Sequence, residues 1–280
     1  MSRPSWRDHM GHLAWPTLAL TAAVWSTVLV STSLALAGQL PLALAGAVNG
    51  LCVYLAFTPM HEAAHGNVGG TKARAWLDRW VGWSCSLLFL APFPAFKAVH
   101  LRHHSTVNQP GKDPDHWVRG SHPLGVAARC LTMVPHYYWM FLGPMAKNTR
   151  ANRRDRAVSV AALVALGVGV LLGTLGGFGV ELLVLWLVPA WLASGALAFA
   201  FDWLPHHPHG DTDRWTNARV LDLPLLPWLL LGQSHHLVHH LWPRVPFYRY
   251  TRVFREQRDE LQAHGSPVVT WRARSERAPT

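Results

Sequence analysis

The stretch Leu182–Phe201 reads LLVLWLVPAWLASGALAFAF and contains no charged side chain. Three further apolar runs, Leu13–Ala37, Leu40–Phe57 and Ala157–Val180, complete a set of four. Each is close to the ~20 residues that a helix needs to cross a ~30 Å hydrocarbon core. The chain is 50% hydrophobic and only 14% charged, unlike an average soluble domain. We therefore predict an all-α membrane protein with four transmembrane helices in two hairpins, at about residues 13–37, 40–58, 157–178 and 180–201.

The basic residues are confined to the segments that flank these hairpins. No Lys or Arg occurs between Asp8 and Thr71 or between Ala157 and Asp213, so all 25 lie elsewhere. The positive-inside rule then places both termini in the cytoplasm. We predict a multi-pass protein of the cell (inner) membrane, with residues 252–280 as a cytoplasmic tail. The net charge of +10 forms a one-sided basic face, suited to anionic lipid or an acidic electron carrier, and we expect no nucleic-acid partner.

The segments between the hairpins are also partly apolar. Trp76–Phe96 and Cys130–Met145 are aromatic and contain prolines, so we predict interfacial or re-entrant helices there. The three cysteines form no CxxC pair and are expected to be buried thiols. We find no sequence repeat and interpret residues 1–280 as a single domain.

Nine of the eighteen histidines occur at helical spacings. They lie in His61-Glu-Ala-Ala-His65, His100-Leu-Arg-His103-His104 and His236-Leu-Val-His239-His240, with a lone His206 after Asp202-Trp-Leu-Pro. Residues three and four apart share one face of a helix, so each cluster can direct its imidazoles at one point. Neutral imidazole is the commonest metal ligand, and nine are too many for one ion. The sequence therefore predicts a cytoplasmic, histidine-rich cap that holds two metal ions.

Other interpretations explain fewer of these residues. His61-Glu-Ala-Ala-His65 matches the HExxH signature of zinc proteases, but that function would leave seven clustered histidines without a role. In the two-metal interpretation Glu62 orients a ligand instead of acting as a general base. Asp202 lies four residues before His206 and is expected to face the site, through water or beside a ligand. Histidines that adjoin the clusters are alternative ligands: His207, His209 and His235.

The histidine clusters resemble the three boxes HxxxH, HxxHH and HxxHH of the integral-membrane fatty-acid desaturase and hydroxylase superfamily, which also has one histidine before the last box. The resemblance implies a non-haem di-iron centre with O2 as co-substrate and with electrons from a ferredoxin or similar carrier. It assigns nine iron ligands: His61, His65, His100, His103, His104, His206, His236, His239 and His240.

Longer stretches resemble the bacterial carotenoid β-ring hydroxylases, the beta-carotene 3-hydroxylases. These stretches are His100–Asn108, Asp113–Trp117, Phe201–His206, Arg214–Val220, Leu231–Pro243 and Pro246–Tyr250. The resemblance implies hydroxylation of the β-ionone ring of a carotenoid such as β-carotene, a substrate that dissolves in the bilayer. The boxes alone do not separate hydroxylation from desaturation, because both begin with hydrogen abstraction. A fatty-acyl or lipid desaturase is therefore the alternative, and a histidine-rich metal transporter is a third, although its ligands should lie along a crossing.

Overall fold

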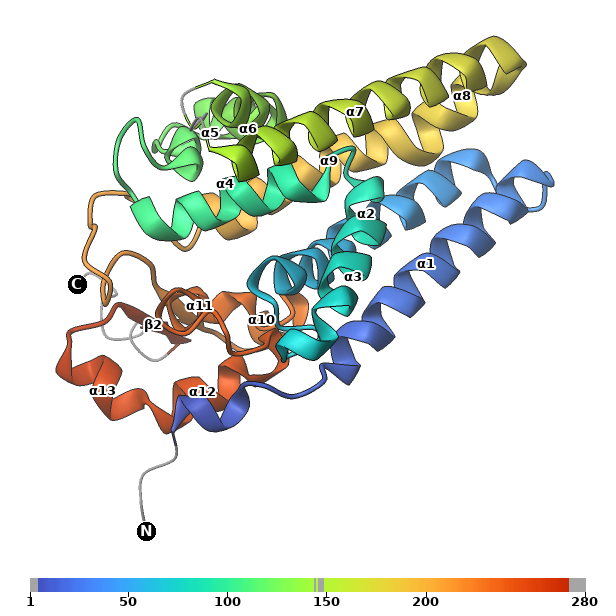
Figure 1. Cartoon of the computed structure of the whole chain (residues 1–280). Helices are drawn as coiled ribbons and strands as arrows, with labels where there is room; N and C mark the ends of the chain where they lie inside the picture. The colour runs from blue at the N-terminus through green and yellow to red at the C-terminus, as the bar shows by residue number, and fades with distance from the viewer. Residues whose placement is uncertain (1–4, 144, 146–148, 272–280) are drawn as a thin grey trace, which may run out of the picture.

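Two long helical hairpins extend in the same direction from a more compact part of the chain in this computed structural model (Figure 1). The structure describes residues 5–143, 145 and 149–271. Residues 204–271 form most of the compact part and are called the cap below. The short helix η1 (Trp6–His9) packs on the cap, where Trp6 stacks on Trp242 with 6.1 Å between ring centroids.

The first hairpin consists of α1 (Trp15–Leu36) and α2 (Leu42–His65). Gly38 turns the chain between them with a φ of 71°. Helix α2 ends where Gly66 adopts the left-handed conformation, with a φ of 73°, which glycine tolerates without a Cβ clash. Helix α2 therefore continues beyond the predicted end of the span at residue 58, and it carries both His61 and His65.

The second hairpin is a nearly continuous run of helical segments. Its first arm is α7 (Arg150–Gly173), and its second arm contains α8 (Gly179–Leu182), η5 (Leu183–Leu187), α9 (Val188–Leu197) and η6 (Ala198–Trp203). Between them, in η4 (Thr174–Phe178), Gly177 has a φ of 92° and breaks the helical path. The two arms fold back on each other there (Figure 1), close to the predicted boundary between spans.

Within the described part of the chain, three helical stretches are long and apolar enough to cross a membrane: Trp15–Leu36, Leu42–His65 and Asn152–Trp203. The third stretch includes both arms of the second hairpin, on either side of Gly177. The structure thus contains four apolar arms in two hairpins, and the crossing of a membrane by each arm stays a prediction.

The two hairpins are joined by close backbone contact and by one buried polar side chain. A Cβ added at Gly46 of α2 would lie 2.5 Å from the carbonyl oxygen of Val184, so the two chains approach as closely as glycine allows. One turn later, the Asn49 amide donates to the Leu185 carbonyl at 2.9 Å and accepts from the Ser31 hydroxyl at 2.6 Å. Such hydrogen bonds satisfy polar groups that lipid could not.

The segment between the hairpins is sharply bent. Helices α3 (Ala75–Leu88), preceded by η2 (Lys72–Arg74), and α4 (Phe93–Thr106) meet at 100°, as in a broken span or a re-entrant loop. Helices α5 (Pro123–Leu131) and α6 (Met133–Leu142) follow, after η3 (Pro114–Val118). The bend returns the chain toward the cap, and α4 delivers the second histidine cluster beside the end of α2. The three cysteines are free and buried, as predicted.

The cap contains the one pair of strands found among the described residues, β1 (Val220–Asp222) and β2 (Val268–Thr270), which pair in parallel. Its helices are α10 (Leu226–Leu229), η7 (Gln233–His235), α11 (His236–Leu241), η8 (Phe247–Arg249), α12 (Tyr250–Glu256) and α13 (Arg258–Ala263). A core that includes Leu237, Val253 and Phe254 holds them together. The all-α prediction did not foresee the strands, because three residues show no readable alternation. Residues 252–271 of the predicted tail pack in the cap, and residues 272–280 lie outside the described residues.

Candidate metal centre

The nine histidines of the predicted metal site gather into two adjoining groups. The five-histidine group contains His61, His65, His100, His104 and His239, and the four-histidine group contains His103, His206, His236 and His240. Within each group, one ring nitrogen from every member lies within 4.8 Å of all the others. The structure thus brings together all nine residues that the sequence singled out.

Helical spacing decides how the residues divide between the groups. His61 and His65 are one turn apart at the end of α2 and point the same way. In α4, His100 and His104 face the five-histidine group, whereas His103 faces the four-histidine group. Helix α11 divides in the complementary manner, because His239 joins the first group while His236 and His240 join the second. Both α4 and α11 therefore lie between the two groups and contribute to each.

The distances between ring nitrogens suit shared metal ions. In the five-histidine group, Nε2 of His65 is 2.7 Å from Nε2 of His100, and Nε2 of His239 is 2.8 Å from Nε2 of His104. In the four-histidine group, Nε2 of His240 is 3.0 Å from Nε2 of His236. Two imidazoles bound about 2.1 Å from one ion, at right angles, are also separated by about 3 Å.

Burial keeps most of these imidazoles in the form that binds metal; His103, whose pKa is raised by two neighbouring carboxylates, is the exception. Burial lowers the pKa of His206 to about 3 and lowers the pKa values of His236, His239 and His240 well below the ordinary range. These rings are neutral at physiological pH, with a lone pair available. Nε2 of His206 is buried without a hydrogen-bond partner among the described residues, as expected of a nitrogen that a metal ion would satisfy. The donor set therefore fits two ions, although imidazole suits iron, zinc and copper alike.

Several of these histidines are oriented through their other ring nitrogen. Nδ1 of His206 donates to the carbonyl oxygen of Asn217 at 2.9 Å. Nδ1 of His239 lies 2.8 Å from the hydroxyl of Tyr250. These contacts fix the ring and leave Nε2 free to bind metal, as is usual around metal-binding histidines.

His103 has the most acidic surroundings of the nine. Its Nδ1 lies 2.8 Å from Asp113 and 3.1 Å from Asp115. Asp113 is itself held by the backbone N–H groups of Asn108 and Asp115. Burial raises the pKa of Asp115 to about 6, while the neighbouring His103 lowers it and Asp113 raises it. This ion pair fixes His103 against the four-histidine group.

Two carboxylates from the sequence analysis lie beside the histidines but in neither group. The half-buried Asp202 carboxylate lies 3.5 Å from the hydroxyl of Tyr137, which donates to Asp115 at 2.7 Å. Asp202 thus belongs to the same cluster of acidic groups that surrounds His103. Glu62 accepts the Phe247 N–H at 3.2 Å and also interacts with the Tyr250 hydroxyl. Glu62 therefore lies next to Tyr250, the residue that contacts Nδ1 of His239. This is not the position of a general base that faces a substrate.

Three adjoining histidines lie outside both groups as the described residues define them: His207, His209 and His235. His235 is fully buried, with its ring against that of Phe254. The sequence analysis did not identify the residues that orient the histidines through Nδ1, namely Asp113, Asp115, Asn217 and Tyr250. All four lie in stretches that the sequence analysis found to resemble the carotenoid hydroxylases: Asp113–Trp117, Arg214–Val220 and Pro246–Tyr250.

An apolar cavity of about 70 Å³ reaches the histidines from the side of the hairpins. Phe57, Phe96 and Phe201 form part of its wall. His100 of the five-histidine group and His236 of the four-histidine group also line it. Phe57 stacks on Phe201 with 5.1 Å between ring centroids. The cavity offers a water-poor approach from the apolar arms to both groups.

Fold and site together define a membrane protein whose apolar hairpins end at two adjoining groups of buried histidines, suited to hold metal ions. The chain belongs to the fatty acid desaturase family, whose sequence profile matches residues 37–272.

Three curated proteins illustrate this similarity. Two fatty acid conjugases of Calendula officinalis, FAC2 B and FAC2 A, are each 22% identical to the chain, over 231 and 233 residues. The matched regions cover 67% of this chain and 60% of each conjugase. A beta-carotene ketolase of Paracoccus sp. (strain PC1) is 42% identical over 74 residues, which cover 25% of this chain and 30% of the ketolase. The chain thus spans about three fifths of the length of the conjugases.

Proposed function

We propose that the chain is an O2-dependent di-iron monooxygenase that hydroxylates the β-ionone ring of a carotenoid such as β-carotene. The observation that carries the proposal is the division of nine clustered histidines, most of them buried and neutral, into two adjoining groups at the end of apolar hairpins. Family membership supports an oxidoreductase with a non-haem di-iron centre.

The nine histidines would hold the two irons, five in one group and four in the other. When bound, the irons would supply the activation of O2 for attack on a C–H bond. Other residues of this chain would fix the orientation of these ligands. Asp113 and Asp115 hold His103, Asn217 holds His206, and Tyr250 holds His239. Asp202 would act from the cavity wall, near the substrate and behind His103. The apolar wall would exclude water and orient the ring.

The reaction needs a co-reactant from outside the chain. Hydroxylation consumes one O2, two electrons and two protons, places one oxygen atom in the new hydroxyl group and releases the other as water. A ferredoxin or a similar carrier would supply the electrons. The basic face of the protein, with its net charge of +10, suits an acidic carrier.

We further propose that the chain forms one domain in the cell (inner) membrane, with four crossings and with both termini and the histidines on the cytoplasmic side. A carotenoid would approach from the lipid, with one ring at the cavity and its polyene among apolar arms. The cavity is too small for a ring, so the flexible lining side chains Met60 and Met133 would move on binding. Similarity to a carotenoid ketolase over 74 residues supports this substrate class.

The decisive test is expression in a β-carotene-producing host that also supplies ferredoxin. We expect β-carotene to be converted to products that carry ring hydroxyl groups, detected by chromatography and mass spectrometry. The His236→Gln variant, expressed at the same level, is the control and should form none. Metal-loaded protein without any hydroxylated carotenoid would contradict the substrate assignment, and products with ring keto groups would show ketolation instead.

A fatty-acyl desaturase on the same scaffold is the second candidate, and the similarity to the two fatty acid conjugases favours it. Acyl chains and carotenoids are both apolar and would reach the cavity from the bilayer. Lipid analysis of the same host separates the two functions. New double bonds in acyl chains, with unchanged β-carotene, would favour the desaturase.

A further inference from the structure

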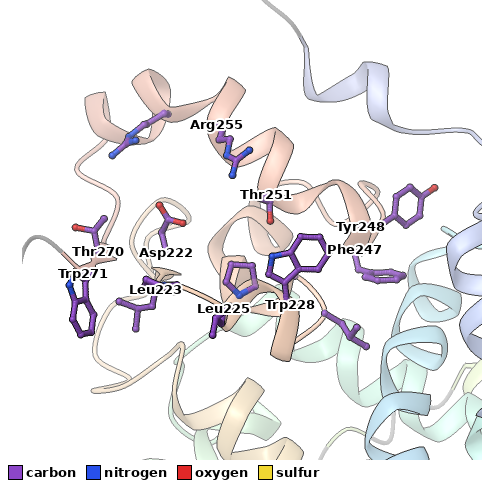
Figure 2. Close-up of a pocket in the computed structure, with 15 residues that line it drawn as sticks. Asp222, Leu223, Leu225, Trp228, Phe247, Tyr248, Thr251, Arg255, Thr270 and Trp271 are labelled. Atoms are coloured by element: carbon purple, nitrogen blue, oxygen red, sulfur yellow. The ribbon is translucent and has the colours of Figure 1, made fainter.

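A second cavity, of about 790 Å³, lies in the cap away from the histidine groups. One wall is the segment from Asp222 to Gly232, which includes α10, and the opposite wall is formed by η8 and α12 (Figure 2). Phe247 and Leu231 line its apolar part, while the guanidinium groups of Arg255 and Arg258 border it. The cavity thus combines apolar and cationic surfaces, the chemistry that an anionic amphiphile requires.

The rim of this cavity exposes large apolar side chains. Trp228 is 84% exposed, Leu225 71% and Trp271 66%. Leu229, next to Trp228 but outside the cavity lining, is 68% exposed. Trp228 and Leu229 belong to α10, and Leu225 directly precedes it, so the three exposed side chains are close together in the chain. An apolar cluster of this kind at a surface marks a contact with a membrane or a partner.

The backbone holds this segment in its projecting shape. Leu225 and Leu231, on either side of α10, have positive φ values of 65° and 49°. Bulky residues rarely adopt such values, and they occur where the surrounding structure enforces them. Pro224 and Pro227 restrict the same segment further. The exposed cluster is therefore a constrained feature of the cap.

The segment also lies at the level where the apolar arms end. Leu230, directly after α10, packs against the core of the arms, which includes Ala56, Met60 and Phe201. Its neighbours Trp228 and Leu229 are thus close to the plane in which a membrane surface would lie. Tryptophan is the residue that favours this headgroup region. Residues 244–260 carry five arginines and three acidic residues, Glu256, Asp259 and Glu260, and the Asp222 carboxylate also lines the cavity. The net local charge is therefore weakly positive, and the cations at the border of the cavity are Arg255 and Arg258.

We propose that this cavity binds a phospholipid with an anionic headgroup at the membrane surface. Arg255 and Arg258 bind the phosphate, while Leu225, Trp228 and Leu229 insert among the acyl chains. The last histidine cluster begins a few residues after α10, so an occupied site also steadies the approach to α11. The proposal is independent of the reaction that the metal centre performs.

The test uses the full-length protein in nanodiscs that contain equal parts of phosphatidylglycerol and phosphatidylcholine. After gentle delipidation, native mass spectrometry counts the retained lipids. The wild-type protein should retain phosphatidylglycerol preferentially. The double variant Arg255→Gln/Arg258→Gln should retain about fivefold less for each arginine removed, since one basic side chain contributes about that factor at an anionic surface. Trp228→Ala should lower retention of both lipids alike.

The matched control is Arg150→Gln/Arg154→Gln, which removes the same charge from exposed positions on α7, also beside an apolar run. This control should retain lipid as the wild type does. Equal losses in both double variants would overturn the proposal, because they would show attraction by net charge alone. Unchanged retention in Arg255→Gln/Arg258→Gln would overturn it in favour of a protein partner. Displacement of the lipid by excess inorganic phosphate would show a site for free phosphate and would also overturn it.

Discussion

His235 and His236 are neighbours in the sequence and are both buried, yet only His236 belongs to a histidine group. We expect His236→Gln to lower the iron content from about two to about one per chain, because the four-histidine group would lose a ligand. His235→Gln is the matched control and should keep both irons, with at most a modest loss of stability from an altered buried contact. Metal analysis of the purified proteins measures both. Equal loss of iron in the two variants would show that the groups are misassigned.

Tyr250 contributes a single hydroxyl to the site, at 2.8 Å from Nδ1 of His239. Tyr250→Phe keeps the buried ring but removes this contact, so we expect metal affinity to fall about 10- to 100-fold. The lost hydrogen bond should also lower the free energy of unfolding by about 1 kcal/mol. Chelator titration followed by metal analysis measures the affinity. Tyr248→Phe lacks a contact with the histidine groups among the described residues and should match the wild type. Coincident chelation curves for the two variants would contradict the role given to Tyr250.

At the scale of elements, the features that the sequence predicted are those that depend on residues close together in the chain. The four apolar runs and the three histidine clusters were predicted because composition and the spacing of three and four residues are local properties. The division of α4 between two groups was not predicted, because the spacing places His103 on a slightly different side of the helix from His100 and His104 but does not show that a second group of histidines lies on that side. The parallel pairing of β1 with β2 joins residues far apart in sequence. Asp113 as the partner of His103 likewise depends on a loop that spacing rules do not place.

The contact between the hairpins at Gly46 gives a prediction for α2. A Cβ at Gly46 would lie 2.5 Å from a backbone oxygen, and backbone cannot yield as a side chain can. Gly46→Ala should therefore lower the free energy of unfolding by about 1–3 kcal/mol. Gly167→Ala on α7 is the control, because its Cβ would meet nothing within 4 Å. It should be neutral or stabilising by up to about 1 kcal/mol. Unfolding in one detergent compares them, and equal stability of the two variants would contradict close packing here.

At the scale of the whole molecule, the site depends on convergence from distant parts of the chain. The end of α2, the end of α4, the turn after η6 and helix α11 all bring histidines to one place. Each hairpin therefore ends at the candidate metal centre, and hairpins that cross a membrane as proposed would have these ends on the same side of it. This geometry agrees with the absence of Lys and Arg from the loop between α1 and α2 and from the turn at Gly177.

The same asymmetry predicts the orientation of the protein. Gln39 lies exposed in the turn between α1 and α2, and Ser121 lies exposed beyond the opposite end of the hairpins. The native thiols are buried, which keeps the background low for labelling of introduced cysteines. In intact cells, an impermeant maleimide should label Gln39→Cys at once, whereas Ser121→Cys should react only after the membrane is opened. The physical reason is that the basic segments stay on the cytoplasmic side. Labelling of Ser121→Cys in intact cells would place the histidines outside and overturn the proposed orientation.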